Sequence, residues 1–307
     1  MPRLRVHRSN LPILSLTVIS LAGCRTAALG LVSDALVQSG SSYAADDDPE
    51  LVREAVPFGL KTMEGLLAEN PRHLQLLTAL ASGFTQYAYA FVQQDAELAD
   101  LDGRLDAART GRDRARKLDL RARDYGLRGL EVRYPGLRQR LLDGREPGPA
   151  LAPLRKEDVP LLYWTASAWA LAVVNGKGDM SLVSQLPVAV AMMERALALD
   201  EAFGEGAIHE FFVSYDATRS AEQGGGPERA RAHLERALAL SGGQKLGPKV
   251  AFAEGVLVQA QDRAEFTRLL SEVVQADAEA VPRYRLANVL AQRRARALLR
   301  HVDDLFA

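Results

Sequence analysis

The chain of 307 residues is poor in several features that mark particular classes of protein. Its only cysteine is Cys24, so it can form no internal disulfide and offers no cluster of cysteine ligands to a metal. Its formal net charge is −1, and the lack of a basic excess argues against nucleic acid as a partner. Isoleucine is scarce while Ala, Leu, Arg and Glu dominate, which favours helices over sheets.

Motifs of the common enzyme classes are missing as well. His209-Glu210 lacks the second histidine that a zinc-peptidase helix needs, since Val213 stands in its place. The run 224–227 lacks the Lys-Ser/Thr of a phosphate loop, and no Gly-x-Ser-x-Gly elbow occurs. We therefore predict no catalytic residue, no metal site and no cofactor. One enzyme hypothesis stays open, a hydrolase with His209 and Glu210 as general base and acid, although adjacent residues point to different sides of a helix.

The single cysteine follows a segment that has the features of a signal peptide. Three arginines form a basic n-region, and an uncharged apolar run follows over residues 11–21. Leu21-Ala22-Gly23-Cys24 then resembles a bacterial lipobox, in which the cysteine thiol carries lipid. We predict a lipoprotein signal peptide over 1–23 and lipid attachment at Cys24. The alternative is that a cysteine follows an apolar run by chance. That alternative does not explain the basic n-region, the length of the apolar run or the position of Cys24 directly after it.

Removal of the signal peptide leaves a chain suited to one large domain on a membrane surface. Three Arg and no acid are lost, so the formal charge becomes −1 − 3 = −4. No second apolar run approaches the ~20 residues of a spanning helix, so we expect a protein that is anchored to a membrane by lipid and does not cross it. Arg25 follows the cysteine in place of Asp, which favours the outer over the inner membrane.

The rest of the chain has the periodicity of helices. Between residues 51 and 67, apolar side chains recur at three- and four-residue steps, and Asp48-Pro49 supplies a cap and a first-turn proline. This helix should end at Asn70-Pro71 and a second should run from about 72 to 94. The last helix should run from about 282 to 306. We find no alternation typical of strands.

An internal repeat points to the architecture. Residues 194–199 and 235–240 are the same six residues, 41 positions apart, and each ends an apolar face with a Leu before a turn. We predict an all-α fold of degenerate TPR-like helical hairpins, stacked as one domain over 47–307 after an anchor and linker over 24–46. A non-repetitive helix bundle is the alternative. The Gly- and Pro-rich run 144–149 should not be helical.

Two further patterns concern side chains. Opposite charges alternate over 100–128, which predicts a solvated, salt-bridged helix face that includes Asp119. Aromatic side chains make up 6% of the chain and gather in two places, over 84–91 and over 163–169. Core packing explains each of them singly, but such pairs can also wall an apolar cavity or channel.

Five strings, two of which contain these aromatic side chains, resemble one family. They are 83–91, 125–131, 162–169, 186–187 and 206–211. Together they resemble the TatT family, the T components of tripartite ATP-independent periplasmic (TRAP) transporters, and the resemblance runs from about 47 to 306.

The resemblance implies a periplasmic lipoprotein of TPR-like hairpins that forms a homotrimer with an apolar channel. It also implies docking with the substrate-binding P component of the transporter and passage of a hydrophobic or amphiphilic ligand. An envelope scaffold without a ligand is the alternative, and it predicts that Tyr87, Tyr89 and Trp164 are fully packed by other side chains. The candidates for ligand or partner contact are Phe84, Gln86, Tyr87, Tyr89, Phe91, Tyr163, Trp164, Trp169, His209 and Glu210.

Overall fold

A computed structural model describes residues 43–143 and 146–306, so Cys24 and most of the predicted linker lie outside the described residues. All regular elements within these ranges are helices, and the fold is one domain, which confirms the all-α prediction. The α-helices are α2 Pro49–Glu69, α3 Leu74–Tyr87, α4 Gln94–Leu101, α5 Leu105–Arg133, α6 Leu137–Asp143, α7 Pro147–Leu151, α8 Val159–Asn175, α9 Met180–Val183, α10 Leu186–Leu199, α11 Ala207–Ala217, α12 Pro227–Leu240, α13 Gly247–Phe252, α14 Arg263–Gln275, α15 Arg285–Arg300 and α16 Val302–Leu305.

Six shorter helical segments join or interrupt these. Two have π-helical hydrogen bonding, η1 Ala88–Gln93 and η5 Ala253–Leu257. The other four are 3-10 turns, η2 Lys156–Asp158, η3 Phe203–Glu205, η4 Ala221–Gln223 and η6 Pro282–Tyr284.

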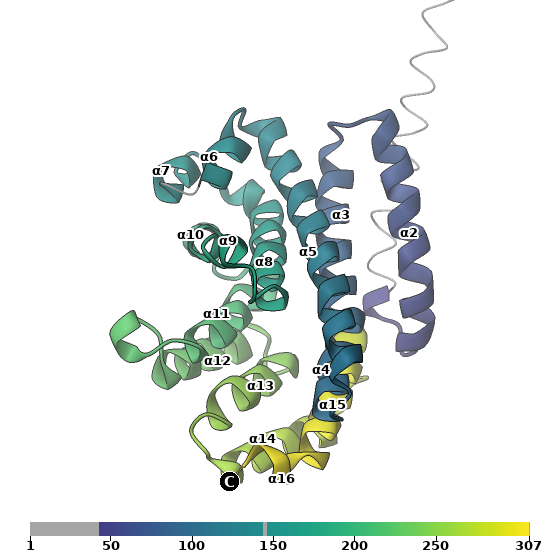
Figure 1. The fold of residues 1–307 in the computed structure, drawn as a ribbon, viewed down its shortest axis with the longest axis vertical. Helices are drawn as coiled ribbons and strands as arrows, with labels where there is room; N and C mark the ends of the chain where they lie inside the picture. The colour runs from purple at the N-terminus through teal and green to yellow at the C-terminus, as the bar shows by residue number, and fades with distance from the viewer. Residues whose placement is uncertain (1–42, 144–145, 307) are drawn as a thin grey trace, which may run out of the picture.

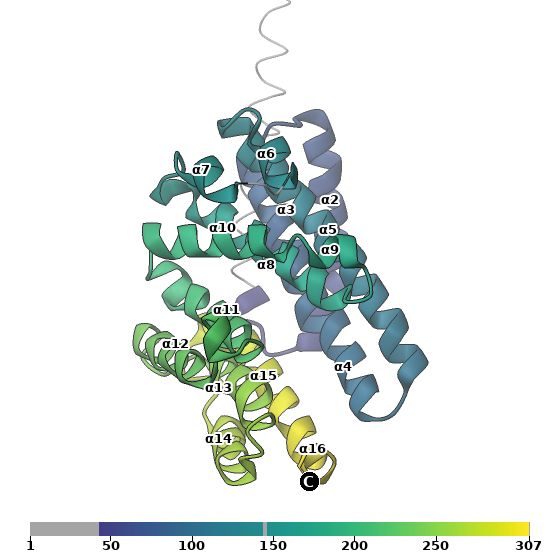
Figure 2. The same cartoon turned by 60° about the vertical axis from the view of Figure 1, so that its left-hand side comes forward.

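The described part of the chain turns back on itself, so that α15 lies near α2. Helices α2, α3, α5 and α8 follow one another in space, and the chain continues through α10 to α14 before α15 returns beside α4 (Figures 1 and 2). Helix α15 also contacts α2. Arg293 Nη1 in α15 lies 2.9 Å from Glu50 Oε1 in α2, and Arg285 Nη1 donates to the carbonyl oxygen of Ala45 at 3.0 Å. Helices α2 and α15 therefore border a common space.

Helix α2 begins and ends where the sequence predicts. The Asp48 Oδ1 atom accepts from the backbone N–H of Glu50 (3.1 Å) and of Leu51 (3.0 Å), and Pro49 occupies the first turn. Asn70 is the C-terminal cap. Its apolar residues Val52 and Leu60 are buried, so the periodicity marks the face that packs inward.

Three predictions of helix boundaries are wrong. The helix expected to end near 94 continues through η1 and α4 to Leu101, because the π segment changes the hydrogen-bond register without breaking the rod. The last helix is interrupted at His301, between α15 and α16. Helix α7 begins inside the run 144–149, expected to be non-helical, and continues to Leu151. Its Pro147 and Pro149 fall in the first turn, where backbone N–H groups have no intrahelical partner to lose.

Helices α5 and α8 approach closely because α5 has glycines at the crossing. A Cβ atom on Gly126 would lie 2.0 Å from Thr165 Oγ1, and one on Gly129 would lie 2.7 Å from Leu161 Cδ2. The central core around this crossing includes Leu127, Leu130 and Trp169. The family-like string 125–131 is thus a packing surface.

The charged face of α5 is only partly as predicted. Ion pairs such as Arg112–Asp100 and Arg116–Asp113 lie on its outside. Asp119, by contrast, is completely buried, and its Oδ2 atom accepts from Asn175 Nδ2 at 3.0 Å. The prediction of a solvated Asp119 is wrong because α8 ends against this point of α5.

The repeated hexapeptides form the last turns of α10 and α12, where Ala196 and Ala237 are buried. The stretch Met180–Leu199, which contains α9 and α10, is long and apolar enough to cross a membrane by length and composition. Our prediction that no second run reaches that length is wrong. Its buried Val188, Met192 and Met193 pack in the central core.

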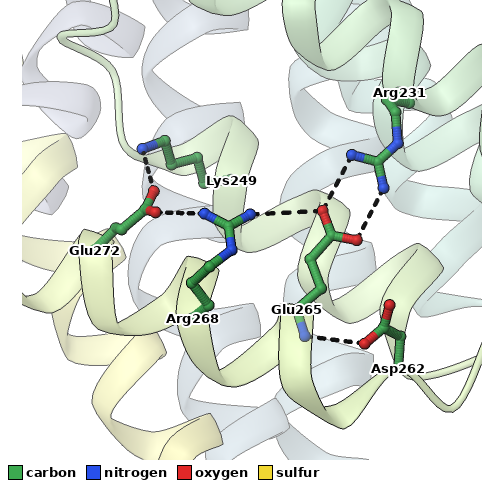
Figure 3. Close-up of polar contacts among 6 residues, drawn as sticks. All are labelled: Arg231, Lys249, Asp262, Glu265, Arg268 and Glu272. Carbon is green, nitrogen blue, oxygen red and sulfur yellow. Dashed lines mark hydrogen bonds and ion pairs between the residues drawn. The ribbon is translucent and has the colours of Figure 1, made fainter.

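A network of ion pairs joins the outer surfaces of α12, α13 and α14 (Figure 3). Arg231 binds both carboxylate oxygens of Glu265, at 3.1 and 3.0 Å. Arg268 bridges Glu265 and Glu272, and Lys249 also reaches Glu272 at 3.0 Å. Such exposed pairs contribute little singly, but the network fixes the mutual orientation of three short helices.

Candidate functional site

A cavity of about 500 Å³ lies between the two ends of the described chain. Its lining comes from α2, α3, η1 and α4 and from α11, α13, η5 and α15. This volume lies in the range of small-molecule sites. The cavity is the leading candidate for a binding site because aliphatic side chains gather on one part of its lining.

The apolar wall is built by the first and last long helices. Val52, Val56, Leu60 and Met63 repeat along one face of α2. On α15, Leu286 and Leu290 face the same space. Apolar residues at three- and four-residue steps share the inner face of α2. The same spacing therefore determines which of its side chains a ligand would contact.

A second part of the lining is polar and carries a charge cluster. Arg294 in α15 donates through Nε to Glu254 Oε1 at 3.0 Å, and its Nη2 lies 3.5 Å from Glu97 Oε2. Burial raises the pKa of Glu254. Glu254 comes from the π segment η5, and Tyr89 comes from the π segment η1. Both π segments thus contribute polar groups to one cavity, as such segments often do at functional sites.

A second ion pair lies farther along the same wall. Lys245 Nζ is 2.7 Å from Glu210 Oε1, and the Lys245 ammonium is 5.7 Å from the ring centre of Tyr284. Tyr89 is 48% exposed, but it lines the cavity. Desolvation, with help from Glu97 and Glu254, raises the pKa of Tyr89, so its phenol is neutral.

Five of the ten predicted contact residues line this cavity, namely Gln86, Tyr87, Tyr89, Phe91 and Glu210. Tyr87 and Phe91 are buried with ring centres 5.7 Å apart, and Tyr89 lies on a different side of the same rod. The aromatic side chains of 84–91 therefore do gather on the helix as predicted, although Tyr87, Tyr89 and Phe91 line the cavity and Phe84 does not.

The other five predicted residues do not line the cavity. Phe84 is buried and stacks on Tyr125, with ring centres 6.0 Å apart. Trp169 is completely buried, and its Nε1 atom donates to Gln185 at 3.0 Å. Both are core residues because their α3 and α8 faces pack on α5.

Tyr163 and Trp164 pack on each other near α11 and η3, and not on Trp169. Their ring centres are 4.9 Å apart, and Phe203 lies 5.1 Å from Tyr163. Burial raises the pKa of Tyr163, with a smaller contribution from Glu210. This pair therefore lies close to the polar wall without forming it.

His209 points away from the cavity while its neighbour Glu210 points into it. The Nδ1 atom of His209 is 2.8 Å from Nδ1 of His233, and its Nε2 is 3.3 Å from Glu201. Burial lowers the pKa of His209. His209 and Glu210 thus share no site, and nothing in the geometry supports their use as an acid–base pair.

Sequence reasoning missed most of the polar wall. Four of its charged residues belong to no sequence motif; they are Glu97, Lys245, Glu254 and Arg294. The first and the last of them are 197 positions apart in the sequence (294 − 97). Within residues 43–143 and 146–306, no group of three or more His, Cys, Asp or Glu side chains could hold a metal ion.

A second hollow, of about 810 Å³, lies on the outside between α2, α4 and α15. Charged residues dominate its lining, and they pair with one another, as Arg293 does with Glu50 and Asp102 with His301. It has no apolar wall comparable to that of α2, so the internal cavity is the stronger candidate.

Two comparisons with known proteins bear on this cavity. A family model described as TRAP transporter T-component matches residues 45–306. An uncharacterised protein of Treponema pallidum (strain Nichols) is 32% identical over 266 residues, which cover 86% of this chain and 82% of that protein. The matched region includes all lining residues of the cavity except Tyr43 and Ala44.

Proposed function

This chain belongs to the TRAP transporter T-component family, and on that premise we propose that it is a periplasmic lipoprotein that holds a hydrophobic ligand and docks with the substrate-binding P component. The family is an accessory component of TRAP transport in the cell envelope, and it is not an enzyme family. The proposal adds the ligand, the partner and the anchor to that coarser role.

The observation that carries the ligand part is the internal cavity. Its α2 and α15 walls present aliphatic side chains, and burial of a hydrocarbon chain against them gains about 0.8 kcal/mol per methylene. A scaffold without a ligand would gain nothing from an internal space of this size. A hydrocarbon ligand would remove these apolar side chains from water, which is favourable.

The anchor and the assembly are further parts of the same proposal. Residues 1–23 serve as signal peptide, Cys24 carries lipid, residues 24–46 form the linker and 47–307 the helical domain. Three copies assemble as a homotrimer with an apolar channel, which gives the ligand a route between the membrane and the P component. Arg25 after the cysteine supports the outer membrane as the site of anchoring.

The test fills the cavity and compares the result with an outward change on the same helix. In Val56→Trp the indole occupies the apolar wall, whereas in Glu54→Trp it lies on the exposed face of α2. We expect native mass spectrometry to find lipid on the wild type and Glu54→Trp, and little on Val56→Trp. Pull-down with the P component of the same transporter should capture the wild type. A protein that carries no lipid and captures no P component would refute the proposal.

A further inference from the structure

Two histidines outside the cavity join α11 to α12. His209 in α11 and His233 in α12 approach through their Nδ1 atoms, which are 2.8 Å apart. The other nitrogen of each ring faces a carboxylate. His209 Nε2 lies 3.3 Å from Glu201 Oε1, and His233 Nε2 lies 3.5 Å from Asp216 Oδ2. The four side chains therefore form a row, acid–histidine–histidine–acid, across the contact between the two helices.

Arginines of α12 flank both ends of this row. Arg236 binds the two oxygens of Glu201, at 2.7 and 2.8 Å, and Arg229 Nε lies 3.4 Å from Asp216 Oδ2. Burial lowers the pKa of both histidines, and the nearby arginine adds to this effect at each of them. Each carboxylate therefore already has a cation beside it, and a positive charge on both rings would be repelled by two arginines.

The contact between the two Nδ1 atoms has room for one proton only. At 2.8 Å one nitrogen must donate and the other must accept. A neutral pair provides that proton, and one more can be added at a ring nitrogen that faces a carboxylate. Another proton would place two N–H groups and two positive charges against each other. The folded protein therefore takes up at most one of the two protons that these histidines bind in the unfolded chain.

Helix α11 has the histidine pair, His209 and His233, on one side and the cavity on another. Glu210 follows His209 directly, lines the cavity and lies 2.7 Å from Lys245 Nζ. Ser214, one turn later, also lines the cavity. Separation of the two rings would free α11 from α12, and α11 carries part of the cavity lining with it.

We propose that the histidine pair is a pH-sensitive switch that holds α11 against α12 at neutral pH, separates in acid and thereby weakens the hold of the cavity on its ligand. The effect on the ligand rests on the proposed function, because it assumes that the cavity is a ligand site. The separation of the helices does not depend on that assumption, so the two can be tested apart.

The first test is urea unfolding of the intact protein at about pH 7.5 and pH 5.5, on either side of the ordinary histidine pKa of 6.5. The unfolded state binds more protons in acid, so the stability that the pair contributes is present above pH 6.5 and is lost as the pH falls. For one proton, the unfolding equilibrium constant of the wild type should rise about tenfold relative to a variant without the pair. Asp119 acts with the opposite sign, but it is common to all variants and cancels.

The variants are His209→Gln, His233→Gln and the double substitution. Because the switch needs both rings, either single change should remove most of the pH dependence, and the double variant should resemble the single ones. Two histidines that were merely buried side by side would each account for about half of it. Ala232→Gln places the same side chain on the exposed face of α12, next to His233, and should behave as the wild type.

The second test measures binding of N-phenyl-1-naphthylamine, an apolar fluorescent probe that is uncharged at both pH values. The wild type should bind it up to about tenfold more weakly at pH 5.5 than at pH 7.5, since the same proton is linked to both events. His233→Gln should bind it almost equally at the two values. Val56→Trp, which fills the cavity, should bind little of it and so shows that the probe binds there.

The outcomes separate this inference from the function on which it partly rests. A wild type whose unfolding has the same pH dependence as that of His233→Gln would overturn the switch. Unfolding that responds to the pair while probe binding does not would overturn the regulation of the cavity. Absence of probe binding at both pH values would refute the ligand site and with it that regulation, and the unfolding result would still decide whether the pair separates in acid.

Discussion

Asp119 gives the sharpest stability prediction, because it is a carboxyl group buried in the core with a single donor. It is completely buried, Asn175 Nδ2 donates to its Oδ2 at 3.0 Å, and its Oδ1 has no partner among the described residues. Desolvation raises the pKa of Asp119 from 3.8 to about 8, with the Asn175 hydrogen bond opposing it. The folded protein therefore retains a proton here that the unfolded chain releases.

The sign and the size of the effect follow from proton linkage. Between about pH 4 and pH 8 the unfolded state binds fewer protons at this residue, so its contribution to stability falls as the pH rises. Two pH units inside that window, from pH 5 to pH 7, correspond to roughly 2.5 kcal/mol. The Asp119→Asn variant keeps the oxygen that accepts from Asn175 and cannot titrate.

The assay is urea unfolding followed by far-UV circular dichroism, on wild type and Asp119→Asn at both pH values. The wild type should lose about 2.5 kcal/mol relative to the variant between pH 5 and pH 7. Asp106→Asn, an exposed carboxylate on the same helix, is the control and should show almost no such difference. A wild type and Asp119→Asn that keep the same difference at both pH values would refute the argument.

Two other changes test packing and anchoring. Gly126→Ala should destabilise the protein by about 1–3 kcal/mol, because its Cβ would lie 2.0 Å from Thr165 Oγ1. Gly65→Ala on the open face of α2 should stabilise it by up to about 1 kcal/mol, and thermal unfolding that ranks the two alike would contradict the α5–α8 packing. Cys24→Ala should release a folded, soluble and still oligomeric protein, which fractionation and size-exclusion chromatography would detect; an insoluble, unfolded product would assign the cysteine a structural role.

The sequence predicted those parts of the fold that depend on local signals. Asp48 and Pro49 mark the start of α2, and the period of its apolar residues marks its buried face. Local signals failed where tertiary packing decided the outcome. The sequence near Ala88 and Ala253 has no signal that predicts a π-helical segment. The charge pattern around Asp119 is typical of an exposed helix, yet Asp119 is buried.

The candidate site was predictable to the same extent. The aromatic stripe on 84–91 led to Tyr87, Tyr89 and Phe91, because a helical period fixes which side chains share a face. Arg294 and Glu254 could not be predicted as site residues, because a single sequence gives no signal for a salt bridge between residues 40 positions apart. The wall of the cavity exists only because α15 returns to α2.

A chain of polar contacts connects the buried Asp119 to that wall. Asn175 donates to Asp119 and also to Gln93 Oε1 at 2.8 Å, and Gln93 Nε2 donates to Glu97 Oε1 at 2.8 Å. Glu97 then faces Arg294. Gln93 ends the π segment that also carries Tyr89, so the segment is held on its inner side by the core and presents Tyr89 to the cavity. Asp119 of α5 and Asn175 of α8 thus help to hold the cavity wall in position. This role accounts for an aspartate at a buried position where an apolar residue would avoid the free-energy cost of desolvation.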